Sequence, residues 1–171
     1  MKALVGLLHD CEIFANLRLK LYKVAAGAGK YEEVAVYISV GADPAWTDYD
    51  GSSALHWVAS DGLVNIARLL LDHGWDLEAR SSAGRRPLHY AAEYGQVEML
   101  QLLAGRGAEL DCQDAEDLYT PLHWAAYNSH AGAVTQLLRL GADGSIRNKD
   151  GLTAEELARD ADTRAAFAEQ R

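Results

Sequence analysis

The chain of 171 residues has few cysteines and no long apolar run, which bounds the kind of protein that it can be. Its two cysteines, Cys11 and Cys112, lie far apart and lack the CxxC spacing of a zinc or redox site. No apolar run approaches the roughly 20 residues that a membrane helix needs. The apolar stretch that follows Lys2 ends at His9, too early for a signal-peptide core. We therefore expect a protein of the reducing cytoplasm or the nucleus, with no disulfide and no membrane partner.

Positive charge is also scarce. The chain has 16 Lys and Arg residues against 25 Asp and Glu residues, which gives a formal net charge of −9. Proteins that bind phosphates gain affinity by neutralising them with Lys and Arg, so this balance argues against nucleic acid. An acidic excess favours solubility, and it leaves open whether a basic partner is attracted as well.

Sequence signatures of catalysis are absent. The chain has no GxxxxGK[ST] phosphate loop, no GxGxxG after a strand and no GxSxG nucleophile motif. A cysteine nucleophile would need Cys11 or Cys112 to meet a histidine across the fold, and His9, His73 and His130 have no regular ligand spacing. We expect no catalytic residue, no metal and no cofactor, so an enzyme is the last of three functional hypotheses.

The sequence contains instead one phrase written three times. Residues 54–62 read ALHWVASDG, residues 87–95 read PLHYAAEYG and residues 121–129 read PLHWAAYNS, at spacings of 33 and 34. Gly41, Gly74 and Gly107 also stand 33 apart. Such a period is the signature of stacked structural repeats.

Each repeat has the same predicted order: a turn with glycine, a short apolar helix, a break and a second helix. The second helices end at Gly74, Gly107 and Gly141, as expected where a chain leaves a helix in a left-handed conformation. Thr120-Pro121 suits a helix start. The threonine hydroxyl can accept a hydrogen bond from a backbone N–H of the first turn, and proline lacks an N–H that would have no acceptor within the helix. Ser53 preserves the capping hydroxyl, whereas Arg86 and Ala54 depart from the pattern, so we expect the second and third repeats to begin their helices less tightly than the fourth. The fold class is therefore all-α.

The stretches TPLHWAA (120–126), RPLHYAA (86–92) and SALHWVA (53–59), with GAD at 41–43 and 141–143, resemble the ankyrin-repeat family. The resemblance implies an ankyrin-repeat solenoid of helix-turn-helix units joined by β-hairpin-like loops over residues 17–165. It also implies that the histidine of each phrase braces the start of its own helix. The expected units are 17–49, 50–82, 83–115, 116–149 and 150–165.

Stacking of these units argues against a shared metal ion. Equivalent histidines of neighbouring repeats would lie about 8–10 Å apart, one helix packing distance. Zinc holds its nitrogen ligands at about 2 Å. His56, His89 and His123 are therefore interpreted as structural.

Two flanking segments complete the chain. Residues 1–16 carry apolar side chains at helical spacing and are expected to form a capping helix on the first repeat, or else a docking helix for a partner. Residues 166–171 are expected to be a C-terminal tail. In the fifth unit Ala154 and Glu155 replace the usual Pro and Leu, as suits a terminal repeat that faces water. We expect a monomer.

The resemblance implies that partners bind on the concave side, formed by the hairpin tips and the exposed face of each first helix. Tyrosine, tryptophan and arginine suit such a role because they supply contact area and directional hydrogen bonds. Taken singly, each residue has an ordinary solvated surface as its alternative, and Trp57, Tyr90 and Trp124 are better explained by packing between repeats. The predicted partner-binding residues are Trp46, Tyr49, Asp50, Ser52, Asp61, Arg80, Arg85, Glu93, Tyr94, Asp114, Glu116, Asp117, Tyr119, Tyr127 and Asn128.

The loop before the fourth repeat is one residue longer than the others, and it has Leu118 at the position of Gly51, Gly84 and Gly151. Without that glycine a different turn is expected, projecting Asp114, Glu116 and Asp117 as an acidic bulge that would suit a basic peptide or protein patch. A tolerated loop insertion is the equal alternative.

The first functional hypothesis is a module that binds a partner protein or peptide in an adaptor or regulatory role. Nucleotide or nucleic-acid binding on the same face is the second, and it is opposed by the shortage of basic residues there.

Overall fold

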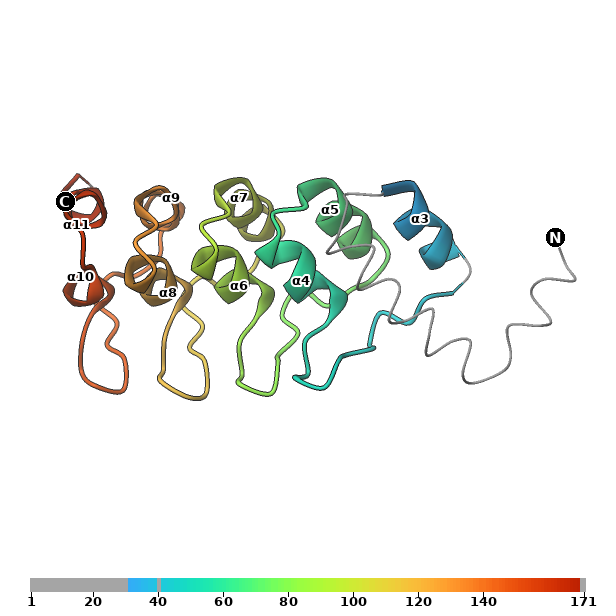
Figure 1. Cartoon of the computed structure of the whole chain (residues 1–171), viewed down its shortest axis with the longest axis horizontal. Coiled ribbons are helices and arrows are strands. Elements are labelled where there is room, and N and C mark those ends of the chain that lie inside the picture. The colour runs from blue at the N-terminus through green and yellow to red at the C-terminus, as the bar shows by residue number, and fades with distance from the viewer. Residues whose placement is uncertain (1–30, 40, 170–171) are drawn as a thin grey trace, which may run out of the picture.

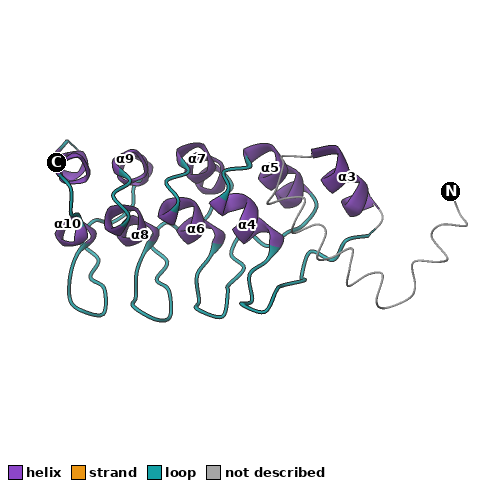
Figure 2. Ribbon diagram, in the orientation of Figure 1, coloured by secondary structure: helices purple, strands orange, loops and turns teal. Residues whose placement is uncertain are grey.

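The computed structural model describes residues 31–39 and 41–169, whose helices form two parallel rows (Figure 1). One row holds α3 (Tyr31–Ser39), α5 (Val64–Asp72), α7 (Val97–Gly105), α9 (Ala131–Leu140) and α11 (Ala161–Ala168). The other holds the short first helices α4 (Ala54–Ser60), α6 (Pro87–Glu93), α8 (Pro121–Tyr127) and α10 (Ala154–Leu157). Loops extend from this second row, away from the first (Figure 2). Isolated antiparallel bridges, Thr47 with Ser53 and Arg147 with Thr153, give two of these loops a hairpin form, and backbone hydrogen bonds from Ser81 to Arg85 and from Asp114 to Tyr119 close the other two.

The first helices α4, α6 and α8 each begin at a residue in extended conformation whose backbone N–H is held by a histidine ring, with the Arg86 N–H donating to His89 Nδ1 at 2.9 Å in α6. In α10 the Thr153 N–H donates instead to Glu156 Oε2 at 2.7 Å. His56 Nδ1 accepts the N–H of Ser53 at 3.0 Å, and His123 Nδ1 accepts that of Thr120 at 3.3 Å. The Thr120 hydroxyl accepts the His123 N–H at 3.3 Å, whereas neither Ser53 nor Arg86 makes this side-chain bond in its own helix. The bond from the His N–H to the capping hydroxyl, expected for the fourth repeat, is therefore present there. In the second repeat the Ser53 hydroxyl lies 2.9 Å from His56 Nδ1 instead, and Arg86 has no hydroxyl to offer.

Arg86 takes the place of the capping hydroxyl in the third repeat. Its side chain is buried and forms ion pairs with Glu78 of the preceding unit and Glu109 at the end of its own unit. Because a buried guanidinium needs partners for its charge, the two carboxylates tie the bases of neighbouring hairpins together.

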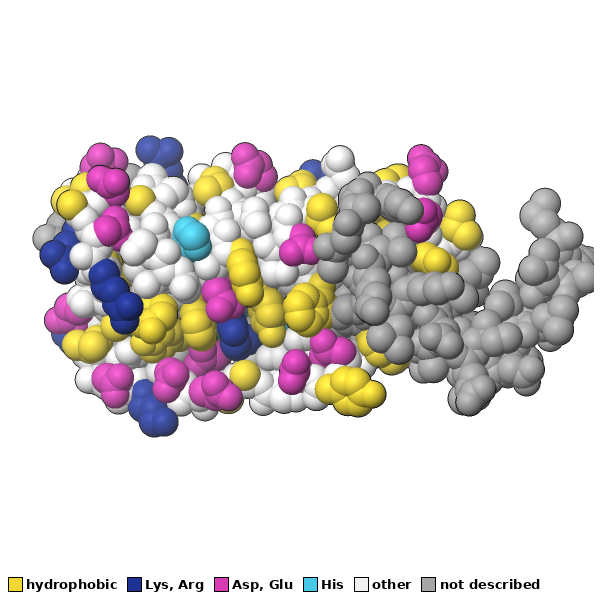
Figure 3. All heavy atoms as spheres, in the orientation of Figure 1, with side chains coloured by type: hydrophobic (Ala, Val, Ile, Leu, Met, Phe, Trp, Pro, Cys, Tyr) yellow, Lys and Arg dark blue, Asp and Glu magenta, His cyan; other side chains and the backbone are white. Residues whose placement is uncertain are grey.

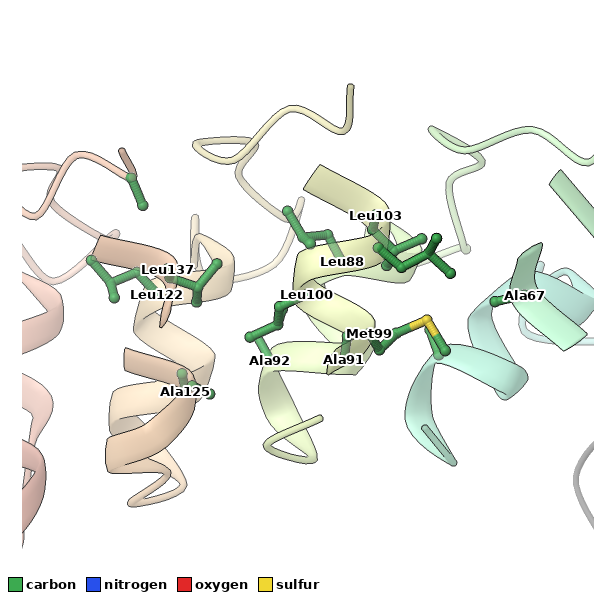
Figure 4. Packing of buried hydrophobic residues seen from close by; sticks show 14 of the residues in the cluster. Ala67, Leu88, Ala91, Ala92, Met99, Leu100, Leu103, Leu122, Ala125 and Leu137 are labelled. Atoms are coloured by element: carbon green, nitrogen blue, oxygen red, sulfur yellow. The ribbon is translucent and has the colours of Figure 1, made fainter. Parts of the chain in front are cut away.

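The core lies between successive repeats. Leu55, Leu88 and Leu122, the leucines of the repeated phrase, are at most 2% exposed. In Figure 4 the labelled side chains of α6, α7, α8 and α9 fill the space between the helices. α4 packs on α6, α6 on α8 and α8 on α10. Helices this short are not stable alone in water, so stacking supplies their stability.

The C-terminal boundary predicted at residue 165 is wrong. α11 continues to Ala168, and Phe167 is only 6% exposed, so the expected tail at 166–171 begins inside a packed helix. Burial of the Phe167 ring against the last repeat explains why the helix continues. The predicted capping helix at 1–16 and residues 17–30 of the first unit lie outside the described residues.

Backbone hydrogen bonds join the tips of neighbouring hairpins. The Ser82 N–H donates to the Asp50 carbonyl at 2.8 Å, Ala115 to Ala83 at 2.9 Å and Lys149 to Asp117 at 2.9 Å. One such bond therefore links each pair of successive tips between the second and fifth repeats. The spacing of the tips is fixed by the fold.

Replacing Gly84 by alanine should destabilise the protein more than replacing Gly74. Both glycines have a positive φ, +70° and +92°, which costs other residues about 1–2 kcal/mol. A Cβ at Gly84 would also lie 2.9 Å from the Ala115 nitrogen of the next tip, whereas one at Gly74 meets nothing within 4 Å. We expect Gly84→Ala to lose at least about 1 kcal/mol more in chemical denaturation. Equal losses would mean that the tips are not in close contact.

Candidate functional site

The hairpin tips and first helices form one continuous surface, which we call the recognition surface. It comprises the outer parts of loops 46–52, 79–85, 112–119 and 146–152 and the exposed sides of α4, α6, α8 and α10. On the face shown in Figure 3, hydrophobic side chains form a band over the first helices, and acidic side chains gather over the loops.

The structure places most of the predicted partner-binding residues at this surface. Exposed ones are Tyr49, Asp50, Asp61, Arg80, Tyr94, Glu116, Asp117 and Tyr127. Half-buried ones are Trp46, Arg85, Glu93, Tyr119 and Asn128. Two, Ser52 and Asp114, are buried.

Asp114 does not project from an acidic bulge, because it is 3% exposed and holds the turn from inside. Its Oδ1 accepts the N–H groups of Asp117 and Tyr119, both at 3.1 Å, and its Oδ2 accepts the Trp124 indole N–H at 3.0 Å. Asp48 makes the same kind of bonds two repeats earlier, to Asp50, Ser52 and Trp57. That recurring short polar residue was a sequence signal for a turn brace.

Ser52 is also structural rather than available to a partner. It is fully buried, and its hydroxyl lies 3.0 Å from the Tyr90 phenol of the next repeat. It therefore helps to hold the Tyr90 ring in place beneath the surface.

Leu118 keeps the left-handed backbone of the glycines it replaces, since its φ of +56° is close to the +70° of Gly51 and Gly84. The turn itself differs, as expected: the Asp114 N–H donates to the Tyr119 carbonyl five residues on, whereas the equivalent bond of the earlier hairpins spans four. The extra residue is accommodated in the turn between Asp114 and Leu118, where Glu116 and Asp117 are exposed. An acidic tip is therefore present, but without Asp114.

Arg85 lies between two aromatic rings of neighbouring repeats. Its guanidinium carbon is 4.5 Å from the centre of the Tyr90 ring and 4.1 Å from that of Trp124, and it forms an ion pair with Glu93. Guanidinium groups stack well on aromatic faces. The sequence indicated packing for Tyr90 and Trp124, and the structure shows that both also sandwich Arg85.

Three rings gather beside Arg85, and we call Tyr119, Trp124 and Tyr127 the aromatic cluster. Their centroids lie 5.3 Å (Tyr119–Trp124), 6.2 Å (Tyr119–Tyr127) and 6.4 Å (Trp124–Tyr127) apart in edge-to-face arrangements. Arg159, which the sequence did not single out, covers Tyr127 at 4.4 Å. It comes from the next repeat, and its position depends on stacking that no local motif reveals.

His56, His89 and His123, the histidines of the repeated sequence, each form hydrogen bonds through both ring nitrogens. Beyond the Nδ1 bonds already described, Nε2 of His56, His89 and His123 lies 3.0–3.1 Å from carbonyls of Arg85, Tyr119 and Leu152 in the next repeat. Burial lowers the pKa of all three rings, that of His89 to about 4, so each is neutral and donates from Nε2. Such rings have no lone pair left for a metal ion.

Metal ligation, a reactive thiol and a membrane-spanning helix are not supported within residues 31–39 and 41–169. No group of three or more His, Cys, Asp or Glu residues could hold a metal ion there. Burial raises the pKa of the Cys112 thiol to about 12, which keeps it protonated and unreactive. No helix of this part is long and apolar enough to span a bilayer.

Family models decide which repeat this is. The model described as "Ankyrin repeats (3 copies)" matches residues 22–114, and "Ankyrin repeats (many copies)" matches residues 90–140. The chain belongs to the ankyrin-repeat family. Ankyrin repeats generally mediate protein–protein interaction and are typically not enzymatic, so the solenoid is a protein-binding scaffold.

A curated protein shares this ankyrin-repeat sequence in part. Palmitoyltransferase Hip14 of Drosophila melanogaster is 32% identical over 108 residues, which cover 63% of this chain. The chain matches 17% of the length of that relative, so the similarity concerns the repeats and not the relative as a whole.

Proposed function

We propose that this ankyrin-repeat protein binds a partner protein or peptide through the recognition surface, in an adaptor or regulatory role and without a cofactor. The observation that carries the proposal is the arrangement of exposed aromatic and charged side chains on tips joined by backbone hydrogen bonds. A surface already fixed in the free protein loses little freedom on binding, which favours affinity.

Exposed tyrosines supply the contacts that such a surface needs. Tyr49 and Tyr94 are 105% and 56% exposed, and Tyr127 is 37% exposed. Binding energy usually concentrates in a few aromatic and arginine anchors. The second helices α5 and α7 present polar residues such as Arg68 and Gln101 instead. The exposed large apolar side chains of that row among the described residues, Tyr31 and Val36, both lie on α3.

Nucleic-acid binding on the same surface is the weaker candidate. Arg85 is paired with Glu93, Arg147 with Glu156, and Lys149 Nζ donates to the Glu116 carbonyl. These cations are engaged by protein acceptors, which leaves few charges for phosphates. A nucleic-acid complex would weaken steeply as the salt concentration rises, and this separates the two functions.

We also propose that the protein acts as a monomer in the cytoplasm or nucleus. The buried, protonated Cys112 thiol suits a reducing compartment. α11 closes the last repeat with exposed polar residues, among them Asp162, Arg164 and Glu169, which favours an end that faces water.

Joint replacement of Tyr49, Tyr94 and Tyr127 by alanine is expected to weaken binding by at least about 2 kcal/mol, or roughly 30-fold. The partner is first captured with the wild-type chain, purified and then titrated against each variant. Because the three rings are exposed, the circular dichroism spectrum and the denaturation midpoint should stay close to those of the wild type.

The matched control changes Arg68 and Gln101 on the second helices to glutamate and should bind normally. If the triple variant binds like the wild type while this control loses the partner, binding uses the opposite side and the proposed surface is wrong.

A further inference from the structure

Two carboxylates beside the aromatic cluster have no counter-charge. Asp117 and Asp150 are exposed, and neither belongs to an ion pair within the described part of the chain. Both lie near Tyr119, whose phenol pKa is raised by burial first and also by the negative charge of these side chains. These two carboxylates therefore add negative charge beside the cluster that no ion pair of the described residues neutralises.

The cations around the cluster already have protein partners. Arg159 covers the Tyr127 ring at 4.4 Å, and Lys149 Nζ donates to the Glu116 carbonyl at 3.2 Å. Arg85 is held between two rings and paired with Glu93, and Arg147 donates to the Gly151 carbonyl and the Glu156 carboxylate. An acidic partner would have to displace Glu93 from Arg85 and would meet Asp117 and Asp150 besides. Repulsion between like charges makes such a partner unfavourable.

The geometry points to a basic partner: we propose that the aromatic cluster receives a Lys or Arg side chain from a basic segment of the bound protein. Its aliphatic stem would lie on the accessible sides of the half-buried Tyr119 and Trp124 rings and on Leu152, which is 38% exposed. Its charge would lie within reach of the two carboxylates. This inference rests on the proposed function, and it assigns the partner's chemistry and the site that reads it.

A displayed library of random short peptides, selected on the full chain, tests this assignment. Sequences enriched on the wild type should be rich in Lys and Arg, and a synthetic peptide made from them should bind more weakly as salt rises. Asp117→Asn with Asp150→Asn should weaken that peptide about tenfold or more. Both side chains are exposed, so this variant should fold like the wild type.

The rings are tested with a conservative pair. Tyr119→Ala should lose about 30-fold in affinity, whereas Tyr119→Phe keeps the ring and should keep most of the binding. Denaturation midpoints show whether Tyr119→Ala, which also removes a ring stacked on His123, has lost more than the contact. If Tyr119→Ala is less stable than the wild type, the proposal is judged on the variant that carries Asp117→Asn and Asp150→Asn.

Different failures have different meanings. Enriched peptides that are neutral or acidic, and that depend on Tyr49 and Tyr94 but not on Asp117 and Asp150, overturn the basic-partner assignment and leave the proposed function standing. No enriched peptide at all, or binding lost only in the Arg68 and Gln101 variant, counts against both.

Discussion

Replacing Leu88 by alanine is expected to lower the free energy of unfolding by about 2–5 kcal/mol. Leu88 is 2% exposed and belongs to α6, which has a first helix packed on each side. Close packing against Met99, Leu100 and Leu103 of the same core leaves the site little room to collapse, so a cavity would remain. Chemical denaturation with linear extrapolation measures the loss.

The matched control is Glu155→Ala, at the equivalent position of the last repeat. Glu155 is half-buried on α10, the last first helix of the described residues, so its replacement should change stability by about 0.5 kcal/mol or less. Comparable losses at both positions would show that the repeat register is misassigned.

Lowering the pH from about 6.5 to about 4 is expected to destabilise the protein through its buried histidines. The folded state holds His89 neutral with a pKa of about 4, whereas the unfolded chain takes up a proton near 6.5. Stability is therefore fully present above 6.5 and falls as the pH falls through this window. His89 alone corresponds to about 3 kcal/mol, and His56 and His123, whose pKa values are also lowered, act in the same direction.

The variant His89→Gln tests whether the buried histidines cause the loss of stability at low pH. The variant should be less stable than the wild type at neutral pH, because bonds to Arg86 and Tyr119 are lost, but it should lose less between pH 6.5 and 4. His73→Gln changes an exposed ring and should leave the pH profile of the wild type intact. An unchanged slope in the His89 variant would mean that other groups cause the acid sensitivity.

Much of the fold could be predicted because the same sequence pattern recurs in each repeat and forms the same pair of helices. The period of the Leu-His phrase marks Leu55, Leu88 and Leu122 as core, and all three are buried. The family resemblance implied that His56, His89 and His123 brace their own helices, which the structure confirms. Their second bond, to a carbonyl of the next repeat, depends on how closely the units stack, and a single sequence does not contain that distance.

The candidate site was predicted less well, for the same physical reason. Asp114 is an acidic residue on a hairpin by sequence, yet it is buried by Trp124 and the backbone of its own turn. Arg159 and Tyr127 are far apart in the repeat pattern and meet only after stacking. Phe167 lies past the last recognisable phrase but is covered by the final helix pair. Contacts between units decided each of these outcomes.

Hydrogen–deuterium exchange of the chain, free and saturated with the purified partner, tests the proposed recognition surface most directly. Protection is expected in the loops at 112–119 and 146–152 and in α8, with little change in α5, α7 and α9. Protection confined to α5, α7 and α9, with unchanged exchange in the hairpin loops, would contradict the proposal that the partner binds the tips and first helices.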